Sequence, residues 1–329
     1  MSRVFITGPD GLLGSNVIRE LLSRNHEVTA LVQRGRDPIT LQGLPIDIVY
    51  GDVTNPEDLL KNSVGCEYMI HIAAITDMWP ILGEHYYKVN VEGTRNAINA
   101  ALAHKVKRFI HVGSASCFGF GSKSSPGDEE TPFKSQKYGL DYIMSKKKAH
   151  ELVLDSIQNK GLPGIIICPT FMIGPHDSKP SSGALIIAIK NGSLPVLSPG
   201  GKNWVSVKAV SVALCNALEN GRVGESYICG GENLSYKEAI ERISVAAGNS
   251  KYPRKPLPSF LIKTAGRISS FVAVVTGKPP RLSYQTAWIA CEHHYFDSSK
   301  AIRELQLPFV SIEEASMDAI SWFSKKGYL

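Results

Sequence analysis

Short apolar runs, rich in β-branched residues, alternate along the first half of the chain with segments of helical periodicity. Each apolar run has the length of one buried strand, and each helical segment can cross from one parallel strand to the next. The expected strands are 4–7, 28–32, 46–50, 68–72, 109–112 and 165–167, and the expected helices are 12–23, 56–62, 89–104 and 139–159. This rhythm predicts an α/β fold built on a doubly wound parallel sheet of the Rossmann type.

The texture of the sequence changes after Pro175. Proline, glycine and serine become frequent in 175–183 and 194–201, and short mixed elements follow. A chain of 329 residues also exceeds one ordinary domain. We therefore expect a dinucleotide-binding domain at 1–174 and a smaller mixed α/β substrate lobe at 175–329, with part of 203–230 packing back on the first domain.

Three glycines follow the first expected strand and open the first expected helix. A strand, a glycine turn and a helix together let the backbone approach a pyrophosphate, which then lies against the unpaired N–H groups of the helix. Glycine triplets also occur in ordinary strand-to-helix turns, so the context of strand and helix carries the prediction. The expected phosphate contacts are Gly8, Gly11, Leu12, Leu13 and Gly14.

Charge and cysteine usage narrow the classes of partner. The formal net charge of +6 is spread along the chain, and 146–148 is its tight lysine run. This distribution predicts no nucleic-acid partner and favours an anionic small molecule. The six cysteines lie far apart without metal-ligand spacing, which indicates reduced thiols, no metal site and no disulfide framework.

Hydropathy predicts a soluble, cytoplasmic protein with no membrane partner. The first core strand begins at residue 3 or 4, which leaves no room for a secretory leader, and no apolar run is expected to reach spanning length. The most apolar tract, Phe271 with 273–275, is expected to be too short to span and to pack within a helix.

Tyr142 and Lys146 form the most informative pair in the chain. Positions four apart on a helix share one face, so both side chains can point into one cleft. A phenol with a pKa near ~10 is a weak acid at neutral pH, and a nearby ammonium stabilises its anion. The pair predicts proton transfer to a carbonyl oxygen during hydride transfer, although an exposed Tyr and Lys on an amphipathic helix would show the same spacing.

Seven motifs follow one another between residues 7 and 175. They are Thr7-Gly8-x-x-Gly11-x-x-Gly14, Gly51-Asp52-Val53, His71-Ile72-Ala73-Ala74, Asn90-Val91-Glu92-Gly93-Thr94, Ser114 before Phe118-Gly119, Tyr142-x-x-x-Lys146, and Cys168-Pro169-Thr170 before Gly174-Pro175. In this order they resemble the extended short-chain dehydrogenase/reductase superfamily, its NAD-dependent epimerase/dehydratase group, and within it the dihydroflavonol-4-reductase-like branch. The resemblance covers nearly the whole chain. The C-terminal segments 276–280 and 295–301 resemble the reductase branch and favour carbonyl reduction over sugar epimerisation.

The resemblance implies a role for each matched residue. Tyr142 would be the proton donor, Lys146 would also bind the nicotinamide ribose, and Ser114 would orient the substrate oxygen, with Ser116 as a competitor for that role. His71 is expected to be a core histidine and Asn90 a structural support. Further cofactor contacts would come from Asp52, Val53, Ala73, Ala74, Pro169 and Thr170. Members of the superfamily often form homodimers through their long helices, so we expect one here.

Cofactor choice depends on the end of the second strand. Enzymes that use NAD usually carry an acidic residue there for the ribose hydroxyls. This chain has none, and Arg34 or Arg36 can bind a 2′-phosphate instead. The sequence therefore favours NADP(H) and leaves NAD(H) open.

Substrate prediction is the least specific part. Loop aromatics and methionines indicate an apolar cleft, and the candidates are Met78, Trp79, Phe118, Phe120, Phe133, Phe171, Met172 and Trp204. They favour a reductase of a ketone or aldehyde on an apolar or aromatic molecule. A nucleotide-sugar epimerase with tightly held NAD stays open, with Lys190, Lys202, Lys208 and Arg281 as cations for the diphosphate.

The same motifs leave one further function open and disfavour another. A non-catalytic dinucleotide sensor is the third alternative, although Tyr142 and Lys146 are both present. Dehydratases of the family carry an acidic residue directly after the position that is paired with the serine. In this chain the neighbours of Ser114 in that stretch are Ala115, Ser116 and Cys117, so dehydration is disfavoured. No base is identifiable near Cys117, so we expect a buried thiol.

Overall fold

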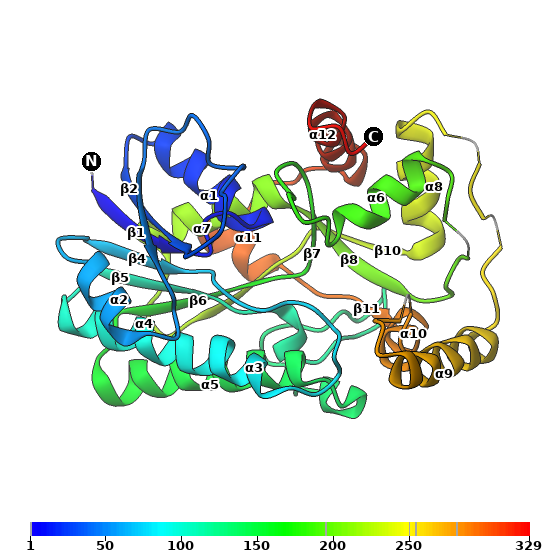
Figure 1. The fold of residues 1–329 in the computed structure, drawn as a ribbon, viewed down its shortest axis with the longest axis horizontal. Coiled ribbons are helices and arrows are strands. Elements are labelled where there is room, and N and C mark those ends of the chain that lie inside the picture. Colours follow the sequence, from blue (N-terminus) through cyan, green and yellow to red (C-terminus); the bar gives the residue numbers. More distant parts are fainter. Residues whose placement is uncertain (1, 195, 250, 254, 281) are drawn as a thin grey trace.

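The computed structural model describes residues 2–194, 196–249, 251–253, 255–280 and 282–329. Figure 1 shows a sheet-centred part that holds the N-terminus and a smaller lobe beside it. Arg281 lies outside the described residues, so its predicted contact with a diphosphate is not addressed.

The larger part is built on a seven-stranded sheet. Its strands are β1 (Arg3–Thr7), β2 (Glu27–Gln33), β3 (Asp47–Gly51), β4 (Tyr68–His71), β5 (Arg108–Val112), β6 (Gly164–Pro169) and β9 (Ser226–Cys229). They run in the order β3-β2-β1-β4-β5-β6-β9, and every neighbouring pair is parallel. The strand order reverses between β1 and β4, which is where open α/β sheets bind ligands.

Helices cover both faces of this sheet (Figure 1). One face carries α1 (Leu12–Ser23), α7 (Val207–Asn220) and α11 (Ser299–Leu305) in one apolar core. The other carries α2 (Pro56–Asn62), α4 (Gly93–Ala103) and α5 (Asp141–Lys160). The predicted doubly wound Rossmann-type fold is therefore confirmed.

Local chemistry explains why some helix bounds were predictable. At α2 the side chain of Asn55 accepts a hydrogen bond from the backbone N–H of Glu57, and Pro56 occupies the first turn. The predicted bounds of α1 and α2 agree with the structure. The helix expected at 89–104 begins earlier, with α3 (Glu84–Tyr87) and a π-helical turn (Lys88–Glu92) leading into α4.

The smaller lobe has its own mixed sheet, as the sequence predicts. Strand β8 (Gly201–Ser206) pairs with β10 (Glu232–Ser235), β11 (His293–His294) and β7 (Phe171–Ile173). Three helices share its apolar core, α6 (Gly183–Lys190), α8 (Tyr236–Ala246) and α12 (Ile312–Lys325). Helices α9 (Ser259–Thr276) and α10 (Tyr284–Ala290) pack on each other beside it (Figure 1).

The chain returns from the smaller lobe to the main sheet. Helix α7 packs on α1 and strand β9 extends the parallel sheet beside β6, whereas β8, which precedes them, belongs to the smaller lobe. The return includes α11 as well, which packs on α7. The division of the chain at residue 174 stays a prediction.

Helix α9 departs from the expectation about apolar tracts. By length and composition alone it could cross a membrane, with 18 residues and mean hydropathy 1.2, although no such stretch was expected. The tract expected to pack within a helix does lie in α9. Only Ala273 of it is buried, while Phe271, Val274 and Val275 are 70%, 76% and 69% exposed. Hydropathy does not show which residues have a partner to pack against.

Candidate functional site

The glycine turn between β1 and α1 is shaped by close backbone contacts. Gly8 has φ +67°, a conformation that favours glycine. A Cβ at Gly14 would lie 2.1 Å from the carbonyl oxygen of Gly8, whereas a Cβ at Gly11 would meet that same oxygen at an ordinary 3.7 Å. Gly11 is also the N-cap of α1 and brings no capping side chain. The first N–H groups of α1 are thus left for an anion.

A cleft of about 900 Å³ lies over this turn and along the carboxyl ends of the central strands. We call it the main cleft. It gathers the predicted cofactor residues from segments far apart in the sequence. Its walls include Gly8, Gly11, Leu12, Leu13, Gly14, Asp52, Val53, Ala73, Ala74, Ser114, Tyr142, Lys146, Pro169 and Thr170. Of the predicted cofactor contacts only Arg34 does not line it.

Tyr142 and Lys146 lie on α5 and both line the main cleft. Lys146 is 4% exposed, and its ammonium donates a hydrogen bond to the carbonyl oxygen of Val112 at 2.7 Å. Burial lowers the pKa of Lys146. Burial raises the pKa of Tyr142 to about 12, and a hydrogen bond with Ser114 acts in the opposite direction. The phenol is therefore protonated at neutral pH.

Ser114 and Ser116 differ in their position relative to the main cleft. Ser114 follows β5 and lines the main cleft, whereas Ser116 is absent from its walls. Their hydroxyl oxygens lie 2.8 Å apart, and the backbone N–H of Ser116 donates to Ser114 Oγ at 3.2 Å. Ser116 thus holds Ser114 in place.

Asn90 connects the segment after β4 to α5. Its amide nitrogen donates to Ile75 O at 3.1 Å and to Ser145 Oγ at 2.9 Å, and its amide oxygen accepts from the N–H of Ile75 at 2.8 Å. Ser145 precedes Lys146. These bonds agree with the structural role expected for Asn90.

His71 is a buried core residue, as expected. Its ring nitrogens lie 2.9 Å from Thr7 Oγ1 and 3.1 Å from Thr94 Oγ1. Burial lowers the pKa of His71 to about 3, with the charge of Lys146 contributing further. The ring is neutral at physiological pH.

The ribose end of the main cleft differs from the prediction. Both terminal guanidinium nitrogens of Arg34 donate to the carboxylate of Asp58 at 2.6 Å, and Arg34 is not in the cleft wall. This bidentate pair holds the pKa of Asp58 below its usual range. Arg36 and Gln33 line the cleft instead, and Arg36 Nε donates to Gln33 Oε1 at 3.1 Å. Of the two arginines expected at this place, Arg36 lines the main cleft and Arg34 does not.

The substrate candidates divide between the cleft and the cores. Met78, Phe171 and Met172 line the main cleft. Trp204 is buried in the smaller lobe, where its ring meets Phe171 and Tyr236 edge to face. The other candidates absent from the cleft wall are Ser116, Trp79, Phe118, Phe120 and Phe133.

Their placement has a packing reason. Phe118 is 7% exposed and packs edge-on against His150 in the core between the sheet and α5. Phe120 lies against His294, with ring centroids 4.0 Å apart. These rings pack against α5 and against the smaller lobe rather than in the cleft wall, so the substrate contacts predicted for Trp204, Phe118 and Phe120 stay predictions.

Sequence reasoning missed the segment that follows β7. Asp177, Ser178, Lys179, Ser181 and Ser182 all line the main cleft. Asp177 is 4% exposed, and its carboxylate accepts hydrogen bonds from the N–H groups of Ser181 and Gly183. The frequent Pro, Gly and Ser in 175–183 predicted a lobe boundary, but no spacing showed that this loop lines the main cleft.

Lys202 is one of the cations in the wall of the main cleft, where Lys179 also lies. Lys202 was predicted only as one of several diphosphate contacts. Its ammonium lies 4.3 Å from the ring centre of Phe171, and among the described residues no carboxylate pairs with it. Burial lowers the pKa of Lys202 to about 8.

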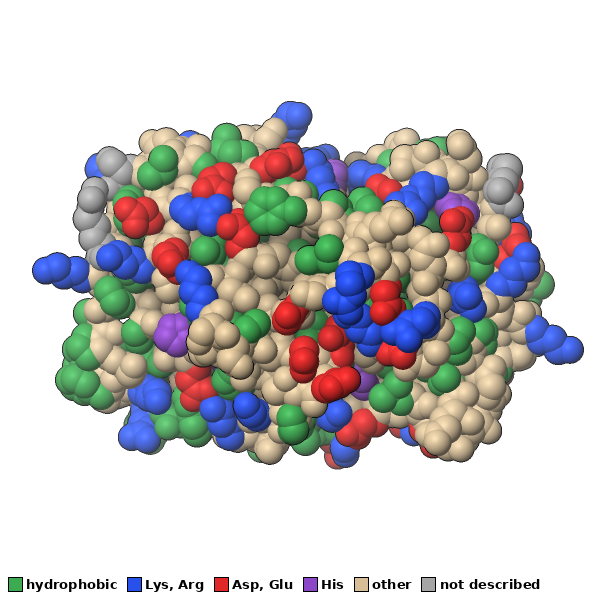
Figure 2. Space-filling view, turned by 180° about the vertical axis from the view of Figure 1, so that it is seen from behind, with side chains coloured by type: hydrophobic (Ala, Val, Ile, Leu, Met, Phe, Trp, Pro, Cys, Tyr) green, Lys and Arg blue, Asp and Glu red, His purple; other side chains and the backbone are tan. Residues whose placement is uncertain are grey.

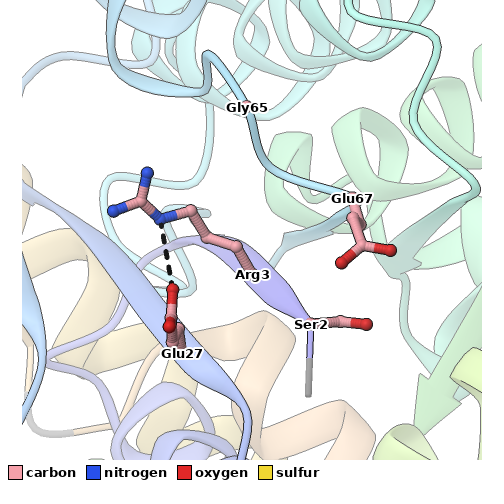
Figure 3. Close-up of a pocket in the computed structure, with 5 residues that line it drawn as sticks. All are labelled: Ser2, Arg3, Glu27, Gly65 and Glu67. Atoms are coloured by element: carbon pink, nitrogen blue, oxygen red, sulfur yellow. Dashed lines mark ion pairs between the residues drawn. The ribbon is translucent and has the colours of Figure 1, made fainter.

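A second hollow of about 370 Å³ lies at the opposite ends of the strands. Figure 3 shows its lining, with Arg3 Nε 3.8 Å from Glu27 Oε2 at the amino ends of β1 and β2. Ligands of open parallel sheets bind at the carboxyl ends, so this hollow is not the functional site. No group of three or more His, Cys, Asp or Glu in the described part of the chain could hold a metal ion.

Comparison with known proteins identifies the family. The model for the NAD dependent epimerase/dehydratase family matches residues 4–230, more than half of the chain. The chain belongs to this family. As a member of the NAD dependent epimerase/dehydratase family, it matches the family model from β1 through β9, and thus across the whole parallel sheet.

Relatives of similar length support the assignment. A Synechocystis sp. protein, named provisionally as a dihydroflavonol 4-reductase, is 32% identical over 330 residues, covering 99% of this chain and 95% of the relative. Sterol demethylase protein B of Methylococcus capsulatus is 28% identical, covering 98% and 99%. The crystal structure of gox2253 has TM-score 0.87 and 32% identity over 100% of both chains.

Proposed function

We propose that this protein is an NADP(H)-dependent reductase of a ketone or aldehyde on an apolar molecule. The observation that carries the proposal is the meeting of Ser114, Tyr142 and Lys146 with the glycine turn in one cleft. The similarity to a relative named as a dihydroflavonol reductase agrees with it.

The residues of the main cleft fit a nicotinamide dinucleotide. The uncapped N–H groups of α1 suit its pyrophosphate, Asp52 suits its adenosine, and Lys146 suits the nicotinamide ribose. When bound, this cofactor supplies the hydride.

The side chains then supply and control a proton. The carbonyl carbon gains the hydride while the carbonyl oxygen gains a proton from the hydroxyl of Tyr142. The buried ammonium of Lys146 stabilises the tyrosinate that remains, and Ser114 holds the substrate oxygen by a hydrogen bond.

NADP(H) selection should depend on Arg36. Arg36→Ala is expected to weaken NADPH binding by roughly 10–100-fold, the loss of one or two charge-assisted hydrogen bonds, and to leave NADH binding nearly unchanged. Fluorescence titration of each nucleotide measures both affinities. Arg34→Ala is the matched control, because Arg34 is held by Asp58. Equal losses of NADPH and NADH in Arg36→Ala would remove the 2′-phosphate assignment.

The same cleft argues against a nucleotide-sugar substrate. Gripping a diphosphate needs several cations, but Lys190 donates to Ala247 O and Lys208 pairs with Asp318. Lys179 and Lys202 remain in the cleft wall, which Met78 and Met172 also line. An apolar carbonyl compound with one anionic or electron-rich group suits this wall better.

Lys202 gives this substrate preference a pH dependence. Because the pKa of Lys202 is lowered to about 8, its ammonium is present below that pH and is lost as the pH rises through it. The KM for an anionic ketone should therefore rise above pH 8, and Lys202→Met should show the higher KM at every pH. A pH-independent KM in the wild type would contradict this role.

Nucleotide content separates the reductase from the epimerase. An exchanging reductase should be purified empty, or with nucleotide that dialysis removes, and should prefer NADPH on titration. Absorbance and mass of whatever is released on denaturation decide the point. Tightly retained NAD would instead indicate an epimerase that returns the hydride to the same substrate.

A further inference from the structure

Helix α9 presents an apolar face to solvent along its whole length. Seven of its large apolar side chains are exposed, and they follow one side of the helix. They are Phe260, Leu261, Ile268, Phe271, Val272, Val274 and Val275. Its buried residues Ile262, Gly266 and Ala273 lie on the opposite side. Figure 2 shows apolar side chains gathered at the lower left, where α9 lies, with cations beside them.

The charged residues in the sequence around α9 all have the same sign. Between Arg242 and Glu292 the sequence contains no Asp or Glu and seven Lys or Arg. Two of these, Lys263 and Arg267, lie on α9 at the edge of the apolar face, 5.5 Å from the ring centre of Trp288 and 4.8 Å from that of Tyr284. Lys255 and Lys278 flank the helix and are exposed.

We propose that α9 docks this protein on an anionic membrane surface, lying in the plane of the interface. An amphipathic helix with aromatic and aliphatic residues on one face and cations at its border binds in this way. Anionic headgroups attract the surrounding lysines and arginines. The proposal stands independently of the carbonyl chemistry.

The packing of α9 argues against a membrane-spanning arrangement. At Gly266 a Cβ would lie 2.7 Å from Cβ of Ala287 and 3.0 Å from the carbonyl oxygen of Ser283, so α9 and α10 are in direct backbone contact. Crossing a bilayer would break this contact and carry Lys263 and Arg267 into hydrocarbon. Lying flat keeps both the contact and the hydrated cations.

A second copy of the chain is a poorer occupant of the same face. A symmetric pair through α9 would bring together two stretches that each carry seven cations and no anion. The cations of the two copies would repel each other, whereas the anionic headgroups of phosphatidylglycerol attract them. Charge therefore selects the membrane over self-association.

The test is co-sedimentation of the full chain with vesicles. Wild type should bind vesicles of phosphatidylcholine mixed with phosphatidylglycerol and bind pure phosphatidylcholine weakly. Phe271→Glu with Val275→Glu should lower the partition coefficient by at least about tenfold, because two side chains no longer enter the acyl region. Lys255→Glu with Lys278→Glu should lower it by roughly fivefold per lysine, and only on anionic vesicles.

Matched controls exclude a general effect of surface change. Phe309 and Val245 are 75% and 71% exposed elsewhere, so Phe309→Glu with Val245→Glu should bind vesicles as wild type does. Unchanged NADPH affinity shows that each variant is folded. Wild type that ignores anionic vesicles overturns the proposal. So does a wild-type dimer that Phe271→Glu with Val275→Glu converts to monomer, because a second copy would then cover α9.

Discussion

Replacement of Tyr142 by phenylalanine is expected to lower kcat by about 10²–10⁴, the usual contribution of a positioned general acid. The variant keeps the ring that packs beside Ile143 and Leu140 and loses only the hydroxyl that carries the proton. Dissociation constants for NADPH should stay within about twofold of wild type, since no proton is transferred on binding. Steady-state kinetics and nucleotide titration on the same preparation measure both quantities.

Ser116→Ala is the matched control for this substitution. It also removes a hydroxyl near the reaction centre, but one that contacts Ser114 and does not line the main cleft. Its kcat should fall much less than that of Tyr142→Phe. A Tyr142→Phe enzyme with wild-type turnover would remove Tyr142 as the proton donor.

Gly14→Ala is expected to produce the second large effect, on folding and on cofactor binding together. The added Cβ would lie 2.1 Å from Gly8 O and 2.9 Å from Pro9 Cα, and both contacts are with backbone. The added methyl group would force α1 away from the turn. Overpacking of this kind should lower the free energy of unfolding by about 1–3 kcal/mol. Denaturant unfolding without nucleotide measures this loss.

Gly11→Ala is expected to weaken cofactor binding with little loss of folding stability. Its Cβ would meet the protein only at 3.7 Å, so the free energy of unfolding should fall by less than about 1 kcal/mol. Gly11 lines the main cleft, however, and a methyl group there keeps a pyrophosphate from the backbone. NADPH affinity should fall by at least about tenfold. Wild-type affinity in Gly11→Ala would show that the dinucleotide does not lie over this turn.

The elements that the sequence predicted best are those fixed by local chemistry. The bounds of α1 and α2 follow from glycine, asparagine and proline placed at their first turns. The strands of the main sheet are short buried runs that only a parallel sheet accommodates. The Tyr142 and Lys146 pair was equally predictable, because two residues four positions apart on a helix lie on the same face.

What the sequence could not show are contacts between segments far apart in the sequence. Arg34 pairs with Asp58, 24 residues later, and nothing near Arg34 in the sequence shows this partner. Trp204 is two residues from Lys202 on β8, yet Tyr236 and Phe171 enclose its ring while Lys202 reaches the main cleft. Hydropathy likewise could not show that α10 covers only one side of α9. Such pairings depend on the tertiary fold.

The most direct test of the account is stoichiometric reduction of an apolar ketone by NADPH. We predict that wild type consumes one NADPH for each alcohol formed, with release of free NADP⁺, and that Tyr142→Phe binds NADPH but forms alcohol at least about 10²-fold more slowly. Loss of the reduced nicotinamide's absorbance and chromatography of the product follow both sides of the reaction. Retention of NAD through purification, with no net consumption of NADPH by any ketone, would contradict the account.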